Sequence, residues 1–180
     1  MLPEPIASEP LLLGALLVVL AVLLAYQRTL SWSEYRLFHQ GKVLLFPILQ
    51  TKVNVLLVSS KGYRAGEYLT TVDDSVGGVF KSLVRSGGSP HLICSVKERE
   101  TPEGQRQYSA AHVVWLHNDG SQTEAYFFEA PDGGVDVQAH HEPGVLDAEA
   151  HLDGSNQTDG DPRGVVWAAL AEKYGVDESG

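Results

Sequence analysis

The stretch that decides the fold is "RQYSAAHVVWLHNDGSQTEAYFFEAPDGGVDVQAHHE", residues 106–142. Three runs rich in β-branched and aromatic residues are separated there by two short turns, Asn118–Gly120 and Asp132–Gly133. Glycine in such turns supplies the positive φ that tight hairpins need. The pattern predicts an antiparallel β-meander, and "HLICSVKERE" (91–100) predicts one more strand before it.

Alternation along the first run predicts which side chains share a face. Ala111, Val113 and Trp115 lie on one face of a strand, and His112 and Val114 lie on the other. Apolar side chains occur on both faces, so we expect this strand near the centre of the sheet.

A helix is expected upstream of the meander, between Asp73 and Gly87. Asp73 or Asp74 can cap its first turn, and Gly87 can end it. Gly77 and Gly78 each cost about 1 kcal/mol relative to alanine in a helix, which indicates that something packs closely there. The apolar stripe has helical spacing and comprises Val76, Val79, Phe80, Leu83 and Val84.

The stretches "KVNVLLVSS" (52–60) and "GEYLTTV" (66–72) read as further strands. The fold class is therefore α+β, with a soluble domain over 52–142 in which a meander of four to six strands is covered by the helix. Residues 143–160 form an acidic linker or loop, and residues 176–180 a disordered tail.

A C-terminal helix is predicted over 161–175. Asp161 can cap it, Pro162 suits its first position, and Gly175 follows its end. Its apolar stripe must be buried on the sheet or on a partner protein. These candidate partner-binding residues are Val166, Trp167, Leu170 and Tyr174.

Near the N-terminus, "LLLGALLVVLAVLLAYQR" runs from Leu11 through Leu20 to Tyr26 and Arg28, and its first sixteen residues carry no charge. We predict a transmembrane helix over 11–30, with Tyr26 at the headgroups and Arg28 reaching the interface. A signal peptide needs an N-terminal basic region and a cleavage site, and neither is present. A core helix needs a polar face, which this run lacks.

Flanking charge predicts the orientation. Residues 1–10 contain no Lys or Arg, whereas Arg28, Arg36 and Lys42 follow the span. The positive-inside rule then places the N-terminus outside and the soluble domain in the cytoplasm, anchored in membrane lipid. Residues 31–51 form a juxtamembrane connector that lies on the membrane or joins the domain as a strand, with Pro47 ending any helix there.

The chain of 180 residues is acidic, with 23 acidic and 13 basic residues and a net charge of −10. This balance disfavours nucleic-acid binding, which requires clustered Lys and Arg. It favours solubility and also suits the salt-rich cytoplasm of halophiles. The single cysteine, Cys94, excludes an internal disulfide and zinc sites that need several cysteines, and we interpret it as a small buried hydrophobe.

No catalytic or cofactor-binding constellation can be assigned. His140, His141 and Glu142 are weak metal candidates, but adjacent strand residues diverge, so we expect structural histidines. His112 and His117 likewise point to opposite faces. A G-x-S-x-G motif is absent. The acidic loop could offer oxygen ligands to Ca²⁺ from Asp153, Asn156, Asp159 and Asp161, but it lacks the EF-hand spacing.

Two functions remain. The first, which the sequence favours, is a single-pass membrane-anchored interaction or structural module, part of a membrane-associated, envelope or virion assembly with a protein partner. The second is a small membrane-anchored enzyme or ligand-binding domain with a pocket between helix and sheet. A deep pocket lined by several of His91, His112, His117 and Tyr126 favours the second. A flat apolar patch, or a C-terminal helix detached from the core, favours the first.

Overall fold

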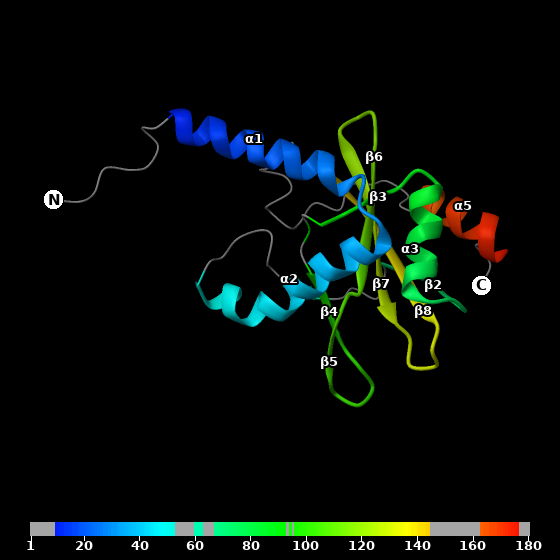
Figure 1. The fold of residues 1–180 in the computed structure, drawn as a ribbon. Helices are drawn as coiled ribbons and strands as arrows, with labels where there is room; N and C mark the ends of the chain where they lie inside the picture. The colour runs from blue at the N-terminus through cyan, green and yellow to red at the C-terminus, as the bar shows by residue number, and fades with distance from the viewer. Residues whose placement is uncertain are drawn as a thin grey trace.

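The computed structural model describes residues 10–52, 60–62, 67–92, 94, 96–144 and 163–176. Figure 1 shows a first helix that projects from a body of packed strands and helices, and a second helix that starts against this body, where Tyr35 is fully buried, and then leaves it. The helices are α1 (Pro10–Gln27), α2 (Trp32–Lys52), α3 (Val76–Arg85) and α5 (Arg163–Tyr174). The strands are β1 (Ser60–Gly62), β2 (Tyr68–Val72), β3 (Ser89–Pro90), β4 (Val96–Glu100), β5 (Arg106–Tyr108), β6 (Ala111–Leu116), β7 (Ser121–Glu129) and β8 (Val135–Pro143).

The larger sheet is antiparallel and has five strands in the order β2-β8-β7-β6-β3. Its centre is the predicted meander β6–β7–β8, in which Ala125 of β7 pairs with Val113 of β6 and with Ala139 of β8. Gly120 and Gly133 adopt φ of 86° and 95° in the two connecting turns. The α+β class and the antiparallel sheet are thus confirmed.

A second, three-stranded sheet has the order β1-β4-β5, with β1 parallel to β4. The prediction of one continuous strand over 106–117 is wrong, because the run divides at Ser109 and Ala110. The Ser109 amide donates to Lys97 O at 2.8 Å, whereas the Ala110 amide donates to Phe127 O at 2.7 Å. Consecutive residues therefore bond to different sheets, which places β5 beside β4 and β6 beside β7.

Helices α3 and α5 cover one face of the five-stranded sheet (Figure 1). The cap of α3 is Ser75 rather than Asp73 or Asp74, since its side chain accepts from the Gly78 amide at 3.1 Å. Val79 and Leu83 of α3 are fully buried in the core that both helices form with the sheet.

The apolar stripe of α5 faces this core. Val166 and Leu170 are fully buried, Trp167 is nearly so, and the Tyr174 hydroxyl donates to Asp74 Oδ2 at 2.8 Å. Of the two predicted alternatives, burial on the sheet or on a partner, the structure shows the first, because the chain's own sheet and α3 cover the stripe.

Helix α1 occupies most of the range predicted for the transmembrane helix and contains Leu11 and Leu20, but it ends at Gln27. Across the described part of the chain, no helix combines the length and the apolar character needed to cross a membrane. Helix α2 occupies the predicted connector and continues through Pro47 to Lys52, so the predicted helix break is wrong. Pro47 has no N–H to donate to the Val43 carbonyl, so the helix continues with one backbone hydrogen bond missing at this point.

Several predicted segments lie outside the described residues. They are most of the tail at 1–10, most of the strand at 52–60, all but the first two residues of the acidic linker at 143–160 with its candidate Ca²⁺ ligands, and most of the tail at 176–180.

Candidate functional site

The first candidate surface is the pair of projecting helices, α1 and α2 (Figure 1). Eleven large hydrophobic side chains are exposed among the described residues, and nine of them lie on these two helices. Soluble proteins seldom expose so many apolar side chains in one region without a binding partner. The nine are Val18, Val19, Val22, Leu23, Tyr26, Leu37, Phe38, Leu44 and Leu45.

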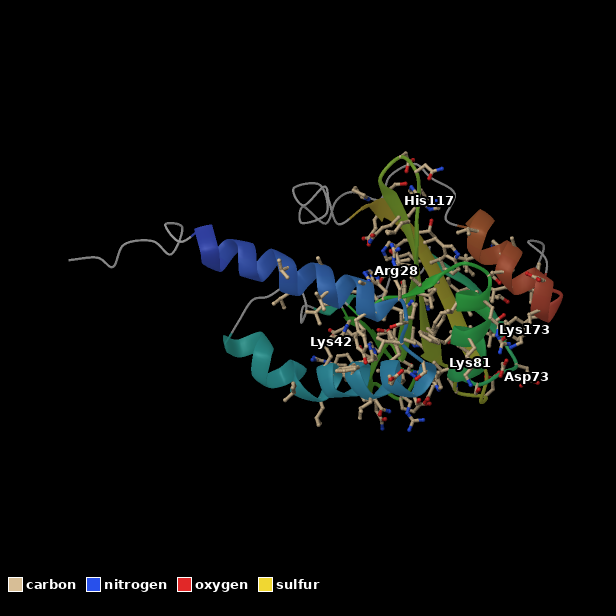
Figure 2. The ribbon with its side chains drawn as sticks, turned by 45° about the horizontal axis from the view of Figure 1, so that its top comes forward. Arg28, Lys42, Asp73, Lys81, His117 and Lys173 are labelled. Atoms are coloured by element: carbon tan, nitrogen blue, oxygen red, sulfur yellow. The ribbon has the colours of Figure 1, made fainter. Side chains whose placement is uncertain are left out.

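Polar contacts attach the two helices to the domain. At the end of α1, Gln27 Oε1 accepts from the Leu92 amide at 3.3 Å. From α2, Lys42 Nζ donates to Leu92 O at 3.0 Å and to Cys94 O at 3.1 Å. Figure 2 shows Arg28 and Lys42 on the side where these helices leave the domain. Both helices are thereby joined to the same short segment before β4.

The second candidate site is the polar face of the five-stranded sheet, which the three-stranded sheet covers. Arg99 of β4 lies 4.4 Å from the ring centroid of Phe128 and forms a 2.6 Å ion pair with Asp136 of β8. Lys97 Nζ lies 5.2 Å from the ring centroid of Tyr126. Several ionisable side chains are buried between the two sheets: Glu67, His91, Lys97, His112, Glu124, Asp136 and His140.

Glu124 lies at the centre of this polar face. Its Oε1 accepts from His91 Nδ1 at 3.0 Å and from His112 Nδ1 at 2.9 Å. Burial raises the pKa of Glu124, but the charge and hydrogen bonds of His112 and His91 outweigh burial and hold the pKa well below its usual range. Burial lowers the pKa of His112 to about 4 despite the opposing charge of Glu124. Glu124 is therefore a buried anion with two fixed N–H donors.

The other carboxylate oxygen of Glu124 faces His140. His140 Nε2 lies 3.3 Å from Glu124 Oε2 and 3.3 Å from Glu142 Oε2. Its Nδ1 lies 3.5 Å from Glu67 Oε2. Burial acts to lower the pKa of His140. The neighbouring carboxylates of Glu142 and Glu67 outweigh burial and raise this pKa to about 9. One imidazole is thus surrounded by three carboxylates.

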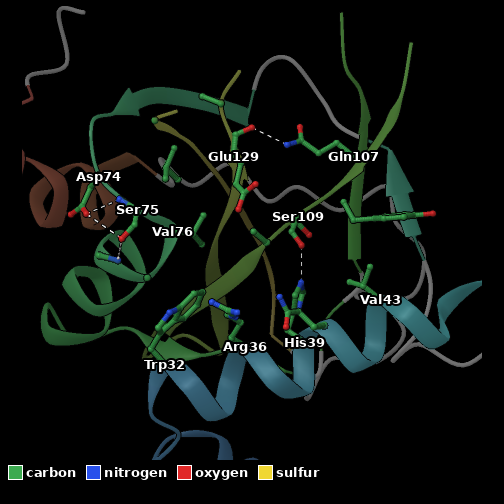
Figure 3. Close-up of a pocket in the computed structure, with 18 of the residues that line it drawn as sticks. Trp32, Arg36, His39, Val43, Asp74, Ser75, Val76, Gln107, Ser109 and Glu129 are labelled. Atoms are coloured by element: carbon green, nitrogen blue, oxygen red, sulfur yellow. Dashed lines mark hydrogen bonds between the residues drawn. The ribbon is translucent and has the colours of Figure 1, made fainter. Parts of the chain in front are cut away.

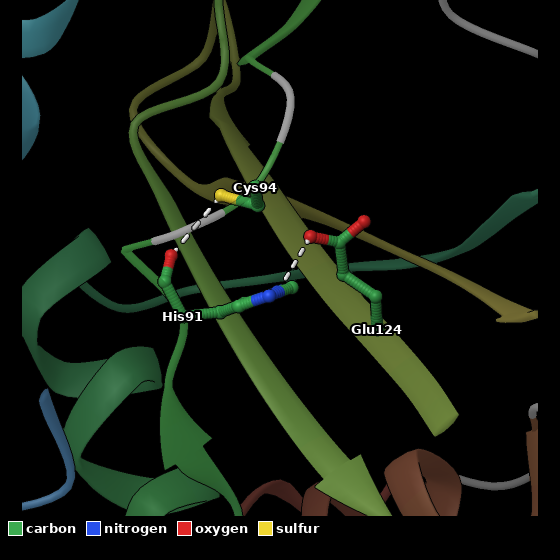
Figure 4. A group of neighbouring side chains, drawn as sticks. All are labelled: His91, Cys94 and Glu124. Atoms are coloured by element: carbon green, nitrogen blue, oxygen red, sulfur yellow. Dashed lines mark hydrogen bonds and ion pairs between the residues drawn. The ribbon is translucent and has the colours of Figure 1, made fainter. Parts of the chain in front are cut away.

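Cys94 contributes no reactive thiol to this cluster. In Figure 4 its sulfur points to the His91 carbonyl, to which it donates at 3.1 Å, while His91 bonds to Glu124. Burial raises the pKa of Cys94 to about 12, even though Lys42 lowers it. Thiolate chemistry therefore has no support here, and burial agrees with the interpretation of Cys94 as a small buried hydrophobe.

The structure separates the three adjacent residues that were weak metal candidates. His140 and Glu142 face Glu124, whereas the His141 ring lies on the opposite face, 5.2 Å from His117 between ring centroids. Thr123 Oγ1 lies within hydrogen-bond distance of both His117 and His141. The predicted divergence of adjacent histidines is what the strand geometry produces.

A cavity of about 1200 Å³ lies between α2, the first turn of α3 and the β5–β6 and β7–β8 connections (Figure 3). His39 enters it from α2 and lies 2.7 Å from Ser109 O through Nε2, which must donate to a carbonyl. Its Nδ1 is buried and has no hydrogen-bond partner among the described residues. That nitrogen is closed to solvent, so it is not open to a ligand in the cavity. The lining also does not include the residues predicted to line a pocket, which are His91, His112, His117 and Tyr126.

Ser109 also links the cavity to the polar face. Its Oγ lies 2.6 Å from His112 Nε2, and His112 contacts Glu124, in the order of a Ser-His-acid relay. However, Ser109 Oγ accepts from the Lys97 amide at 3.1 Å, and Ser109 is only 2% exposed. A substrate has no access to this hydroxyl, so we assign it a structural role.

Comparisons with protein-family models, with curated proteins and with solved structures find no match to this chain. Its function must therefore be argued from these sites and not from relatives.

Proposed function

We propose that this protein is a membrane-anchored module in which α1 and α2 hold the folded α+β domain against lipid. The observation that carries the proposal is the gathering of nine of eleven exposed large hydrophobic side chains on these helices. Full burial of each such side chain in an apolar medium contributes about 1.5–3 kcal/mol, so several together suffice for stable attachment.

Charge supports one orientation of the attached protein. Arg28 and Arg36 are exposed beside the apolar side chains. Cationic side chains in this position are attracted to the anionic lipids of the cytoplasmic leaflet. A single pass with the N-terminus outside and the domain in the cytoplasm stays a prediction. A protein partner also stays a prediction, and it would need a surface other than the buried stripe of α5.

Vesicle flotation of the full chain tests the attachment. We expect the wild type to float with vesicles of phosphatidylcholine and phosphatidylglycerol. Replacing Val18, Val22 and Leu23 of α1 with glutamine should leave the protein at the bottom of the gradient. Leu116→Gln is the matched control, because Leu116 is an exposed apolar residue on β6, away from both helices. Equal flotation of the triple variant and the control would refute the proposal.

Topology requires a separate measurement. A Cys94→Ala chain with one cysteine added after Gly180 can be labelled in intact cells with an impermeant maleimide. The predicted orientation requires protection until the cells are lysed. Labelling without lysis would overturn the cytoplasmic placement of the domain.

A second candidate function is ligand binding by the domain, which the cavity supports. A cavity of about 1200 Å³ whose lining includes Arg36, Asp74 and Gln107 suits a small polar molecule. Native mass spectrometry of the purified full chain should reveal a bound small molecule. Val43→Trp, which fills the wall of the cavity on α2, should remove it. A bare wild-type mass would refute this candidate.

A further inference from the structure

We propose that Glu124, His140 and Glu142 form a binding site for a divalent transition-metal ion. His140 Nε2 lies 3.3 Å from one oxygen of each carboxylate, and the three ligand atoms all lie within 4.8 Å of one another. Zinc binds imidazole nitrogen and carboxylate oxygen at about 2.0–2.2 Å, which separates neighbouring ligand atoms by about 3.3 Å at a tetrahedral angle. The two nitrogen–oxygen separations equal this spacing, and the two carboxylate oxygens lie within 4.8 Å of each other.

Each proposed ligand is also held by a further side chain. Glu124 Oε1 accepts from His91 and His112, which leaves Oε2 directed at His140. Glu142 Oε1 accepts from Gln122 Nε2 at 2.7 Å, which leaves its Oε2 directed at His140. Such outer partners fix the orientation of metal ligands and are typical of built sites.

The remaining nitrogen of His140 completes the arrangement. Nδ1 is buried, lies 3.5 Å from Glu67 Oε2 and makes no hydrogen bond in the described structure. With a metal ion at Nε2, the proton of the neutral ring resides on Nδ1 and faces the Glu67 carboxylate. This is the carboxylate–histidine–metal order that many metal sites use.

Because the site is buried, the charge of its carboxylates favours the binding of a cation. Glu124 is 3% exposed, and the side chain of Glu142 is 13% exposed. Buried carboxylates need compensating positive charge. Protonated His140 provides one charge without a metal, and a divalent ion that displaces this proton provides two.

The donor set indicates the class of ion. One imidazole and two carboxylates suit Zn²⁺, Mn²⁺ or Fe²⁺, whereas Ca²⁺ prefers oxygen ligands alone and Cu⁺ prefers sulfur. Cys94 Sγ is engaged with the His91 carbonyl and is not part of this set. Three protein ligands leave one position open to water.

Zinc titration of the full chain tests the site. The protein is purified in mild detergent without a histidine tag and stripped with EDTA. It is then titrated with Zn²⁺ against a chelating indicator. We expect one Zn²⁺ per chain and at least tenfold weaker binding in Glu142→Gln. Two control variants should bind Zn²⁺ as the wild type does. Glu129→Gln makes an equal charge change at the exposed end of β7, and His141→Gln replaces a histidine on the opposite face of the sheet.

Each outcome decides the proposal. Failure of the wild type to bind Zn²⁺ or Mn²⁺ at micromolar concentration overturns it without reference to any variant. Loss of binding in His141→Gln together with full binding in Glu142→Gln overturns it by placing the ion near His117. Circular dichroism of the stripped Glu142→Gln protein shows whether it folds. If the variant does not fold, the test is the wild type alone: Zn²⁺ must raise its thermal unfolding midpoint, and an unchanged midpoint overturns the proposal.

Discussion

Gly77→Ala should destabilise the protein, although the same change usually stabilises a helix. A Cβ at Gly77 would lie 2.5 Å from Trp32 Nε1 and 2.8 Å from Trp32 Cε2. The indole packs against the rings of Phe80 and Tyr35, with centroids 5.0 Å and 6.2 Å away, so it must shift against them or towards the cavity to admit the methyl group. Helix propensity contributes about 1 kcal/mol in favour of alanine, whereas overpacking costs about 1–3 kcal/mol. We expect a net loss of about 1 kcal/mol.

Urea unfolding of the full chain in mild detergent measures this loss. Gly41→Ala is the control, because Gly41 lies inside helix α2 and has nothing within 4 Å of an added Cβ. The control should gain up to about 1 kcal/mol. Adding Trp32→Leu should remove most of the penalty at Gly77, since the clash is with the indole. A Gly77→Ala protein as stable as the control would refute the close packing of α2 on α3.

Three further predictions concern polar groups. Asp136→Asn should lower the free energy of unfolding by about 1–3 kcal/mol in urea, because Arg99 loses a largely buried partner at 2.6 Å. An unchanged value would contradict this. Tyr35→Phe should cost about 1–3 kcal/mol, since the His112 amide donates to this hydroxyl at 2.8 Å, and an unchanged thermal midpoint would argue against it. Burial and the charge of His112 lower the pKa of His39 from 6.5 to about 3, so the unfolded chain protonates first. Stability then falls by up to about 1.4 kcal/mol per pH unit as pH drops from 6.5 towards 3, and His39→Gln should reduce this slope between pH 7 and pH 5. Equal slopes in the two proteins would refute the prediction.

The central sheet was predictable because its signals are local. Gly120 and Gly133 mark the turns, and alternation identifies the face that α3 covers. The division of 106–117 between two sheets was not predictable in this way. Ser109 and Ala110 carry no turn signal, and only tertiary partners on β4 and β7 determine where each amide donates.

The polar cluster was predictable only in part. Glu124 carries the one local signal, a carboxylate that directly precedes the apolar stretch "AYFF" and shares a strand face with Tyr126 and Phe128. The approach of His91 and Glu67 to that face depends on long-range pairing. His140 and Glu142 were singled out, but nothing in their spacing identified Glu124 as their neighbour, because that contact arises from the β7–β8 register.

The two faces of the five-stranded sheet contribute differently to the free energy of folding. The face under α3 and α5 is apolar and supplies the core. The other face buries Glu124 with His91, His112 and His140, and well-packed apolar side chains in such a place are often equally or more stabilising. An arrangement that folding does not require points to a role in binding. Tyr35 connects this arrangement to the apolar helices, because its hydroxyl on α2 donates to His91 O and accepts from the His112 amide. If both proposals hold, Tyr35→Phe should weaken Zn²⁺ binding without changing flotation, whereas loss of flotation would show that the cluster supports the helices and not the ion.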